Sequence, residues 1–313
     1  MMSKYASTKS YSHVKGAAFA LSGACLWGLS GNVAQYLFAD QSVNAGWLTS
    51  FRMISSGLLL LVWAYFREPD SVWKIWTMRA SRQSLLAFGL IGMIGAQYTY
   101  FEAVSAGNAA IATLLQYISP VILLLYFAFK GHRWPAAHEQ VGVLLSTLGV
   151  FLIASQGNVS HMSLAPAAVF WGLLSAIGCA VYAALPGKLL RQWGTGIVIG
   201  WGMVIGGTVM ACFYPPWIYG GRMTIHAFFG ILFVIVFGTL VAFSLYVTSL
   251  NYLKPIETSL LGCAEPLSAA LVSVLWMHTA FTLYDWAGSC CIIGTVFLLS
   301  LTHNSRTHAQ ANN

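Results

Sequence analysis

Long apolar runs separated by short polar segments are the main pattern along this chain of 313 residues. Most runs reach the ~20 residues that an α-helix needs to cross the hydrocarbon core of a bilayer. The runs do not alternate apolar and polar residues as the strands of a membrane β-barrel do. The pattern predicts ten membrane-spanning helices, of which the fifth and tenth are short: Gly16–Phe38, Gly46–Phe66, Leu85–Val104, Ala109–Phe129, Gln140–Ala154, Ala167–Leu189, Gly196–Tyr214, His226–Ser249, Pro255–Trp276 and Trp286–Leu301.

Two halves of the chain repeat the same order of landmark residues. Tyr100 precedes Pro120 by 20 residues, and Tyr246 precedes Pro266 by the same 20. If each half holds five helices, an odd number, the second half must be inserted upside down, as in many secondary transporters. We therefore expect an all-α integral membrane protein with ten transmembrane helices in two inverted five-helix repeats. The repeats would be residues 16–158 and 159–301, and the tails residues 1–15 and 302–313.

The composition also indicates a membrane protein, because 58% of the residues are hydrophobic and only 7% are charged. A soluble domain carries ~25% charged residues. The net charge of +7 comes from basic residues that form no dense patch, so we expect no nucleic-acid partner. With ten spans, 13 of the 15 Lys and Arg residues fall on the side of both termini, Arg222 falls on the other side, and Arg52 lies within a span. Because Lys and Arg concentrate in cytoplasmic loops, both termini of this multi-pass membrane protein should be cytoplasmic.

Motifs for catalysis and metal binding are missing from the sequence. The six cysteines lie in apolar runs, with no C-x-x-C pair and no histidine at metal-binding spacing. The chain also lacks the phosphate-binding G-x-x-x-x-G-K-[ST] loop and the H-E-x-x-H motif. The apolar run Gly16–Phe38 is longer than the ~7–15-residue core of a signal peptide, so we interpret it as a retained helix. We expect no cofactor, no metal and no enzymatic activity.

Several segments resemble one transporter family. They are ACLWGLSG at Ala24–Gly31, Arg52 in the second span, NAAIATLLQYISP at Asn108–Pro120 and CAEPLSA at Cys263–Ala269. Together with the repeat, they resemble the EamA-type transporters of the drug/metabolite transporter superfamily, especially the YicL-like bacterial inner-membrane members. The resemblance implies export of amino acids or other small metabolites. Many relatives carry a glutamate just after the fourth helix of each half, but here those regions read KGHRW and WMHTA. A role for those glutamates therefore cannot be transferred to this chain.

Glu265 is the strongest candidate for substrate binding. It lies near the middle of the expected Pro255–Trp276 span, directly before Pro266. A charged side chain at this depth costs roughly 2.5–3.5 kcal/mol on insertion scales, and such residues usually face a cavity or a partner. Glu265 could bind a cationic group of the substrate or a proton, which makes protons a candidate coupling ion. The alternative is a protonated, structural side chain that is hydrogen-bonded to the nearby backbone.

Pro120 and Pro266 are the candidate hinges. Each proline removes a helical hydrogen bond, so the carbonyls of Gln116 and Gly262 lose the donors four residues further on. A kink at these points would let the helix bend during alternating access or offer a polar group to the substrate. A static kink that neighbouring helices stabilise is the alternative.

The other candidates for substrate binding are more ambiguous. Arg52 could bind a carboxylate of the substrate or of Glu102, or it could extend to the outer surface. Aromatic rings with polar tips suit an amphipathic substrate, although packing between helices is the competing role. The remaining predicted substrate-binding residues are Gln116, Trp27, Tyr98, Tyr182 and Tyr246.

These observations favour a secondary transporter that moves a small metabolite by alternating access. The substrate class would be an amino acid or a related compound, and the direction would be export. The partners would be this small molecule and the lipid bilayer. A membrane-embedded lipid-handling enzyme, a scramblase and an importer of the same substrate class are the alternatives.

The topology generates the first prediction. Alkaline phosphatase, which is active only outside the cytoplasm, is fused after Arg222 in one protein and after Asn313 in another. Because the basic residues place both termini in the cytoplasm, we expect activity from the Arg222 fusion and none from the Asn313 fusion. The opposite pattern of activity would reverse the model.

Overall fold

Helices make up the part of the chain that the structure describes, which is all except residues 1, 132–133, 157–163, 220–222 and 312–313, and it contains no strand. In this computed structural model the first half comprises α1 (Met2–Ala39), α2 (Ala45–Arg67), α3 (Pro69–Lys74), α4 (Arg79–Ala87), η1 (Phe88–Met93), α5 (Ile94–Ala106), α6 (Ala109–Gln116), α7 (Ser119–Lys130) and α8 (Ala137–Ser155). The second half comprises α9 (Pro166–Ala184), α10 (Gly187–Trp193), α11 (Thr195–Phe213), α12 (Ile225–Ile235), η2 (Val236–Val241), α13 (Ala242–Ser249), α14 (Pro255–Gly262), α15 (Ala264–Leu275) and α16 (Leu283–Ala311). The prediction of an all-α membrane protein is confirmed.

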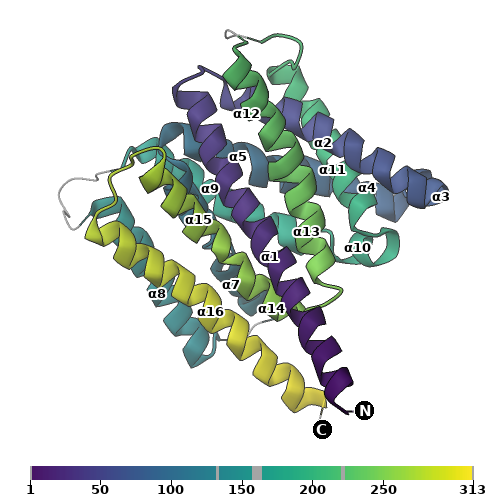
Figure 1. Cartoon of the computed structure of the whole chain (residues 1–313), viewed down its shortest axis with the longest axis vertical. Helices are drawn as coiled ribbons and strands as arrows, with labels where there is room; N and C mark the ends of the chain where they lie inside the picture. The colour runs from purple at the N-terminus through teal and green to yellow at the C-terminus, as the bar shows by residue number, and fades with distance from the viewer. Residues whose placement is uncertain (1, 132–133, 157–163, 220–222, 312–313) are drawn as a thin grey trace.

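Eight helical segments of the described chain are long and apolar enough to cross a membrane. Two further apolar helices, Glu139–Ser155 and Leu283–Leu299, are shorter. They coincide with the fifth and tenth expected spans, which the sequence also predicts to be short. In Figure 1, α1 begins and α16 ends at the same end of the bundle. The expected boundary between the repeats, at residues 158 and 159, lies outside the described residues, as does Arg222.

Helix boundaries differ from the expected spans where polar segments continue a helix or a proline ends one. The helix α1 begins at Met2 rather than at Gly16, and α16 continues to Ala311. The expected span Ala167–Leu189 is divided, because α9 ends at Ala184 and α10 begins after Pro186. Proline has no N–H to continue the helical hydrogen bonds, which explains this break.

Two π-helices occupy corresponding places in the two halves. The helix η1 lies between α4 and α5, and η2 lies between α12 and α13, and each is six residues long. A π-helix accommodates one extra residue within a helical segment and is often found at functional sites. The apolar pattern gives no signal for either element, because each lies within a long apolar segment of the chain.

Glycines let three helix pairs approach closely. A Cβ atom at Gly57 of α2 would lie 2.9 Å from the carbonyl oxygen of Gly200 in α11. A Cβ at Gly178 of α9 would collide with the backbone of Gly95 in α5, and one at Gly149 of α8 would lie 2.8 Å from the carbonyl oxygen of Gly288 in α16. Small residues at such crossings allow the backbone contacts that replace the hydrophobic effect inside a membrane.

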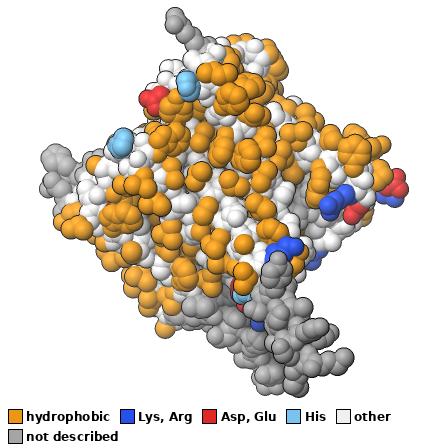
Figure 2. Space-filling view, in the orientation of Figure 1, with side chains coloured by type: hydrophobic (Ala, Val, Ile, Leu, Met, Phe, Trp, Pro, Cys, Tyr) orange, Lys and Arg blue, Asp and Glu red, His pale blue; other side chains and the backbone are white. Residues whose placement is uncertain are grey.

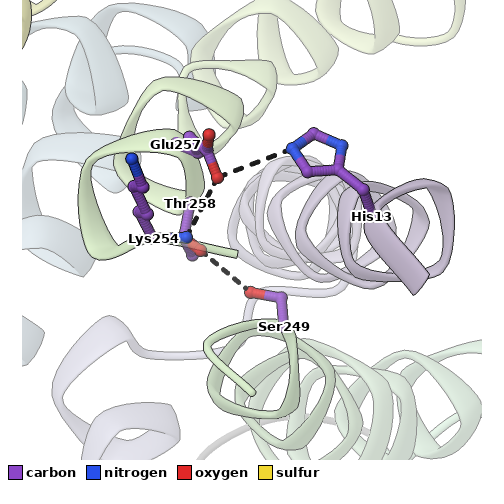
Figure 3. Close-up of polar contacts among 5 residues, drawn as sticks. All are labelled: His13, Ser249, Lys254, Glu257 and Thr258. Atoms are coloured by element: carbon purple, nitrogen blue, oxygen red, sulfur yellow. Dashed lines mark hydrogen bonds and ion pairs between the residues drawn. The ribbon is translucent and has the colours of Figure 1, made fainter. Parts of the chain in front are cut away.

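Polar contacts join α1 to the start of α14 at the end of the bundle where the chain begins (Figure 3). His13 Nε2 lies 3.6 Å from Glu257 Oε2, and the same carboxylate oxygen accepts a hydrogen bond of 3.0 Å from the Lys254 backbone N–H. The hydroxyls of Ser249 and Thr258 lie 3.3 Å apart and connect α13 to α14. These contacts hold the base of α14, which is the helix that leads to Glu265.

The face of the bundle that Figure 2 shows is largely apolar, as lipid contact requires. Large side chains such as Phe66, Phe129 and Phe213 are more than 70% exposed. Lys, Arg, Asp and Glu side chains are few in this view, and many of them lie at its right-hand side, in the region of α3. Lipid tails can cover this apolar surface, so the exposure fits a membrane protein.

The close contact of α9 with α5 generates the second prediction. Gly178→Ala places a methyl group against the Gly95 backbone, so we expect a loss of about 1–3 kcal/mol of stability from overpacking. Gly294→Ala in α16 is the matched control, because a Cβ there has no neighbour within 4 Å. Thermal unfolding in detergent, followed by fluorescence-detected gel filtration, measures both variants. Equal midpoints for Gly178→Ala and the wild type would contradict this packing.

Candidate functional site

A cavity of about 370 Å³ lies inside the bundle, between the two halves of the chain. Helices α1, α2, α5 and α6 and the π-helix η1 line it from the first half, and α9, α11, η2, α13 and α15 line it from the second. The volume lies within the range of ~300–1,000 Å³ that small-molecule sites occupy. The cavity can therefore hold a small metabolite but not a large polymer.

Six of the seven predicted substrate-binding residues line this cavity. They are Glu265, Gln116, Trp27, Tyr182, Tyr246 and Arg52. They come from six different segments, so the fold brings together residues that are far apart in the sequence. Of the described residues that line the cavity, Arg52 and Glu265 are the ones with Lys, Arg, Asp or Glu side chains. The cavity wall thus contains one Arg and one Glu side chain, and its other described residues are uncharged.

Glu265 lies in the first turn of α15, at the break between α14 and α15. The hydroxyl of Tyr117 lies 3.1 Å from Glu265 Oε2 and donates to it. Helix α1 packs tightly on the other side, because a Cβ at Gly28 would lie 2.5 Å from the Glu265 carbonyl oxygen. The side chain therefore has a defined position at the cavity wall.

The two candidate hinge prolines lie just after matching helix breaks. Helix α6 ends at Gln116 and α7 begins at Ser119, while α14 ends at Gly262 and α15 begins at Ala264. The break residues Tyr117 and Cys263, each three positions before its proline, have similar backbone angles, with φ of −68° and −61° and ψ of 0° and −8°. The sequence predicts a kink at each proline within one continuous span, and the role of Pro120 and Pro266 as moving hinges stays a prediction.

The carbonyl that Pro266 leaves without its helical donor has a different partner. Gly262 O accepts a hydrogen bond of 2.8 Å from the hydroxyl of Tyr117. A free carbonyl within a membrane is costly, and a side chain from another helix is one of the ways to satisfy it. Since Tyr117 belongs to the break in the first half, the two breaks are joined directly to each other.

Arg52 is buried, with 6% of its surface exposed, so it does not reach the outer surface. Its guanidinium group lies 4.2 Å from the centre of the Phe101 ring and donates a hydrogen bond to the Gln97 side-chain oxygen. Within the described chain no carboxylate lies within 4.0 Å of it, so it does not pair with Glu102. Its Nε atom is buried and has no hydrogen-bond partner among the described residues. This side chain therefore keeps an unused donor at the cavity.

The aromatic residues and Gln116 form the rest of the predicted site. The Trp27 and Tyr246 rings lie 4.9 Å apart between centroids, and Tyr182 lies 5.4 Å from Phe88. The Gln116 amide donates to Ser175 Oγ at 2.7 Å, so it also joins α6 to α9. Each of these residues both packs between helices and faces the cavity.

Tyr98 lies apart from the described residues that line the cavity. Its hydroxyl lies 3.1 Å from the hydroxyl of Tyr214, and its ring packs against Trp171 with centroids 5.8 Å apart. The helical period explains the difference, because Tyr98 is adjacent to Gln97 and points in another direction from the cavity-lining Gln97 and Tyr100. Any binding role of Tyr98 in another conformation of the protein stays a prediction.

An apolar cluster lies at one side of the cavity, beyond Phe101. It joins the end of α1, the start of α2 and the start of α12, and includes Leu37, Trp47, Leu48 and Ile231. Leu60, Met93, Ile199 and Met203 of a second cluster line the cavity itself. The polar groups are thus enclosed between two apolar layers.

Sequence reasoning missed the cavity residues Gln97 and Tyr100, the π-helices and the role of Tyr117. Thr239 of η2 and Met93 of η1 both line the cavity. Tyr100 is a landmark of the repeat in the sequence, whereas Tyr117 has no signal beyond its position three residues before Pro120. The sequence had no signal for which of the many aromatic rings faces inward.

The fold and the cavity define a multi-pass membrane protein with an internal site for a small molecule. Comparison with known proteins identifies the family. The model of the EamA-like transporter family matches residues 14–155 and again residues 166–301. The chain therefore belongs to the EamA-like transporter family of the drug/metabolite transporter superfamily, and it is a membrane transporter rather than an enzyme.

Named relatives agree with this assignment. The chain is 37% identical over 301 residues to the inner membrane transporter YicL of Salmonella typhimurium, covering 95% of this chain and 98% of the relative. It is 24% identical to the protein PecM of Dickeya dadantii, covering 90% of this chain and 89% of that protein. A solved structure with 16% identity covers 94% of this chain and 97% of its own, with a TM-score of 0.60, which supports the fold. The location in the inner membrane follows from the relationship to YicL and from the apolar helices.

The environment of Arg52 generates the third prediction. Arg52→Lys keeps the charge but loses the planar group that lies over Phe101 and donates to Gln97, so we expect a loss of about 1–2 kcal/mol of stability. Arg67→Lys is the matched control, because Arg67 lies 4.4 Å from the Trp63 ring centre at an exposed position. Thermal unfolding in detergent measures both variants. Equal losses of stability in Arg52→Lys and Arg67→Lys would show that burial of Arg52 does not strengthen its contacts.

Proposed function

We propose that this transporter moves an amino acid or a related small metabolite out of the cell by alternating access between two inverted five-helix repeats. The observation that carries the proposal is the pairing of Arg52 and Glu265 at one cavity of about 370 Å³. An amino acid carries a carboxylate and an ammonium group, which have the charges opposite to those of Arg52 and Glu265. The site is therefore complementary to a zwitterion.

Arg52 is suited to the carboxylate. No described residue accepts a hydrogen bond from the buried Nε–H. A buried donor without a partner is unfavourable, and a ligand that accepts a hydrogen bond from it removes this cost. Guanidinium groups also match the planar geometry of a carboxylate. Glu265 is suited to the ammonium group, and Trp27 and Tyr246 provide aromatic faces beside it. Leu60, Ile199 and Met203 offer an apolar surface for the remainder of the substrate.

Matching features of the two halves support the inverted repeat. The breaks at Tyr117 and Cys263 correspond, and so do the π-helices η1 and η2. Contacts between the halves also correspond: α9 packs on η1 and α5, just as α1 packs on η2 and α13. In transporters with such repeats, the substrate binds near the midplane and one bundle moves against the other.

The direction rests on the family resemblance, which implies export. The predicted cytoplasmic position of both termini rests on the distribution of Lys and Arg. Protons are the candidate coupling ion, because Glu265 is the carboxyl group at the cavity that could release or bind one. The competing possibility is facilitated diffusion, in which Glu265 serves only the substrate.

The fourth prediction tests this site. Glu265→Gln keeps most of the shape but cannot ionise, so we expect normal folding and membrane insertion together with loss of substrate binding or of the pH dependence of transport. Radiolabelled amino acids and metabolites are tested in proteoliposomes, with and without a pH gradient. The pH is varied from about 5 to 8, a range over which a buried carboxyl group can change its protonation state. Asp70→Asn is the control, because Asp70 is exposed in α3, away from the cavity.

Equal transport by wild type and Glu265→Gln over the whole pH range would remove Glu265 from the mechanism. If neither protein moves any member of the panel, the proposal that the substrate is an amino acid or a related metabolite fails. If oriented vesicles show movement of the substrate only toward the cytoplasmic side, the protein is an importer and the proposed export is wrong.

A further inference from the structure

The break between α14 and α15 contains a hydrogen-bonding arrangement that the transport proposal does not use. The hydroxyl of Tyr117 lies 2.8 Å from Gly262 O and 3.1 Å from Glu265 Oε2, and both oxygens are acceptors. A tyrosine hydroxyl has one hydrogen, so it cannot make a full hydrogen bond to both at once. The two acceptors therefore compete for one donor.

The outcome of this competition depends on the charge of Glu265. A carboxylate accepts a stronger hydrogen bond than a neutral carbonyl, so an ionised Glu265 draws the Tyr117 hydrogen toward itself. When a proton from the cavity binds Glu265, the carboxyl group becomes a donor and Tyr117 can accept from it. The Tyr117 hydrogen then turns fully toward Gly262 O. No covalent bond other than the O–H of Glu265 is made or broken.

Gly262 O is the carbonyl that Pro266 deprives of its helical donor. A change in the Tyr117 hydrogen bond therefore changes the stabilisation of the break itself. Helix α15 is held to α1 by Asn32, which donates to Ala269 O at 3.0 Å and accepts from Ser273 at 2.7 Å. Bending at the break would thus be transmitted from α15 to α1.

We propose that Tyr117 is a positioning residue that links the protonation of Glu265 to the conformation of the break between α14 and α15. Occupation of Glu265 by a proton or by a cationic group of the substrate frees the Tyr117 hydrogen for Gly262. Loss of that proton or cation returns the hydrogen to the carboxylate and weakens the contact at the break. This inference goes beyond the proposed function by naming the group through which the site acts on the helix, and it rests on that function only where transport is the readout.

The groups that face Glu265 leave Tyr117 as the direct donor. Among the described residues, those that interact electrostatically with Glu265 are Tyr100 of α5, Tyr117, Cys179 of α9, Tyr246 of α13 and Cys263. Arg52 of α2 lines the same cavity, and α1 contacts this turn through Gly28, which has no side chain to titrate. Of these side chains, Tyr117 is the one with a hydrogen bond to the carboxylate oxygen.

The fifth prediction concerns the titration of Glu265, which can be measured without any substrate. Full-length protein in nanodiscs is titrated by infrared spectroscopy, and the protonated-carboxyl band that Glu265→Gln abolishes is assigned to Glu265. Tyr117→Phe removes a donor that stabilises the carboxylate, so Glu265 should stay protonated to higher pH. We expect the midpoint of the band to rise by about one to two pH units, the range that a hydrogen bond to a charged group represents.

Two further variants keep this test decisive. Incorporation of 3-fluorotyrosine at position 117 keeps both contacts and the fold but strengthens the donor, so it should lower the midpoint. Tyr219→Phe is the matched control, because the buried Tyr219 hydroxyl has no partner among the described residues. Unchanged midpoints in both Tyr117 variants would overturn the proposal, as would an equal upward shift in Tyr219→Phe.

Transport provides a separate readout. For a substrate of the panel, the pH profile of Tyr117→Phe should shift in the same direction as the infrared midpoint. In the Glu265→Gln background, Tyr117→Phe should not shift the profile, and a full shift there would show that Tyr117 acts through another group. If no panel compound is transported but the infrared midpoint shifts, the proposed substrate class fails while the link between Tyr117 and Glu265 stands.

Discussion

The rest of the structure depends on one requirement, which is that every backbone polar group inside a bilayer needs a hydrogen-bond partner. Pro120 and Pro266 lie just after two helix breaks, and each leaves one carbonyl without its helical donor. At Gly262 this demand is met by Tyr117, from the break in the other half of the chain. The contact that satisfies the backbone therefore also joins the two halves beside the cavity.

The halves share a layout but divide the chemistry between them. Tyr117 in the first break corresponds to Cys263 in the second, and Ser119 corresponds to Glu265, each at the same distance from its proline. One half thus provides the hydroxyl donor and the other provides the carboxyl. Matching helix breaks with different side chains give the cavity two chemically different sides, which suits the zwitterion of the proposed function.

Much of the fold and part of the site could be predicted from the sequence, because apolar length and proline position have local physical meanings. The apolar helices, the short fifth and tenth spans, and an irregularity of the helix at Pro120 and Pro266 follow from these signals. Glu265 and Arg52 stood out because charged residues within apolar runs are costly. Tyr98 lies apart from the residues that line the cavity, and the sequence could not show this because an aromatic residue has the same composition signal whether it packs or lines a site. The contact between Tyr117 and Gly262 could not be predicted, because it joins residues 145 positions apart.

The π-helices have a consequence for how the cavity tolerates change in chain length. Each of η1 and η2 holds a residue more than an α-helix of the same rise would hold, immediately before the segments that carry Tyr100 and Tyr246. Removal of one residue from η2 would restore ordinary helical winding over the same rise, so Tyr246 would keep its place at the cavity. Removal of one residue from an α-helical part of the same segment would instead rotate the residues beyond it by about 100° about the helix axis, which is one residue's turn. The two π-helices are therefore the places where these segments can lose a residue without turning the cavity wall.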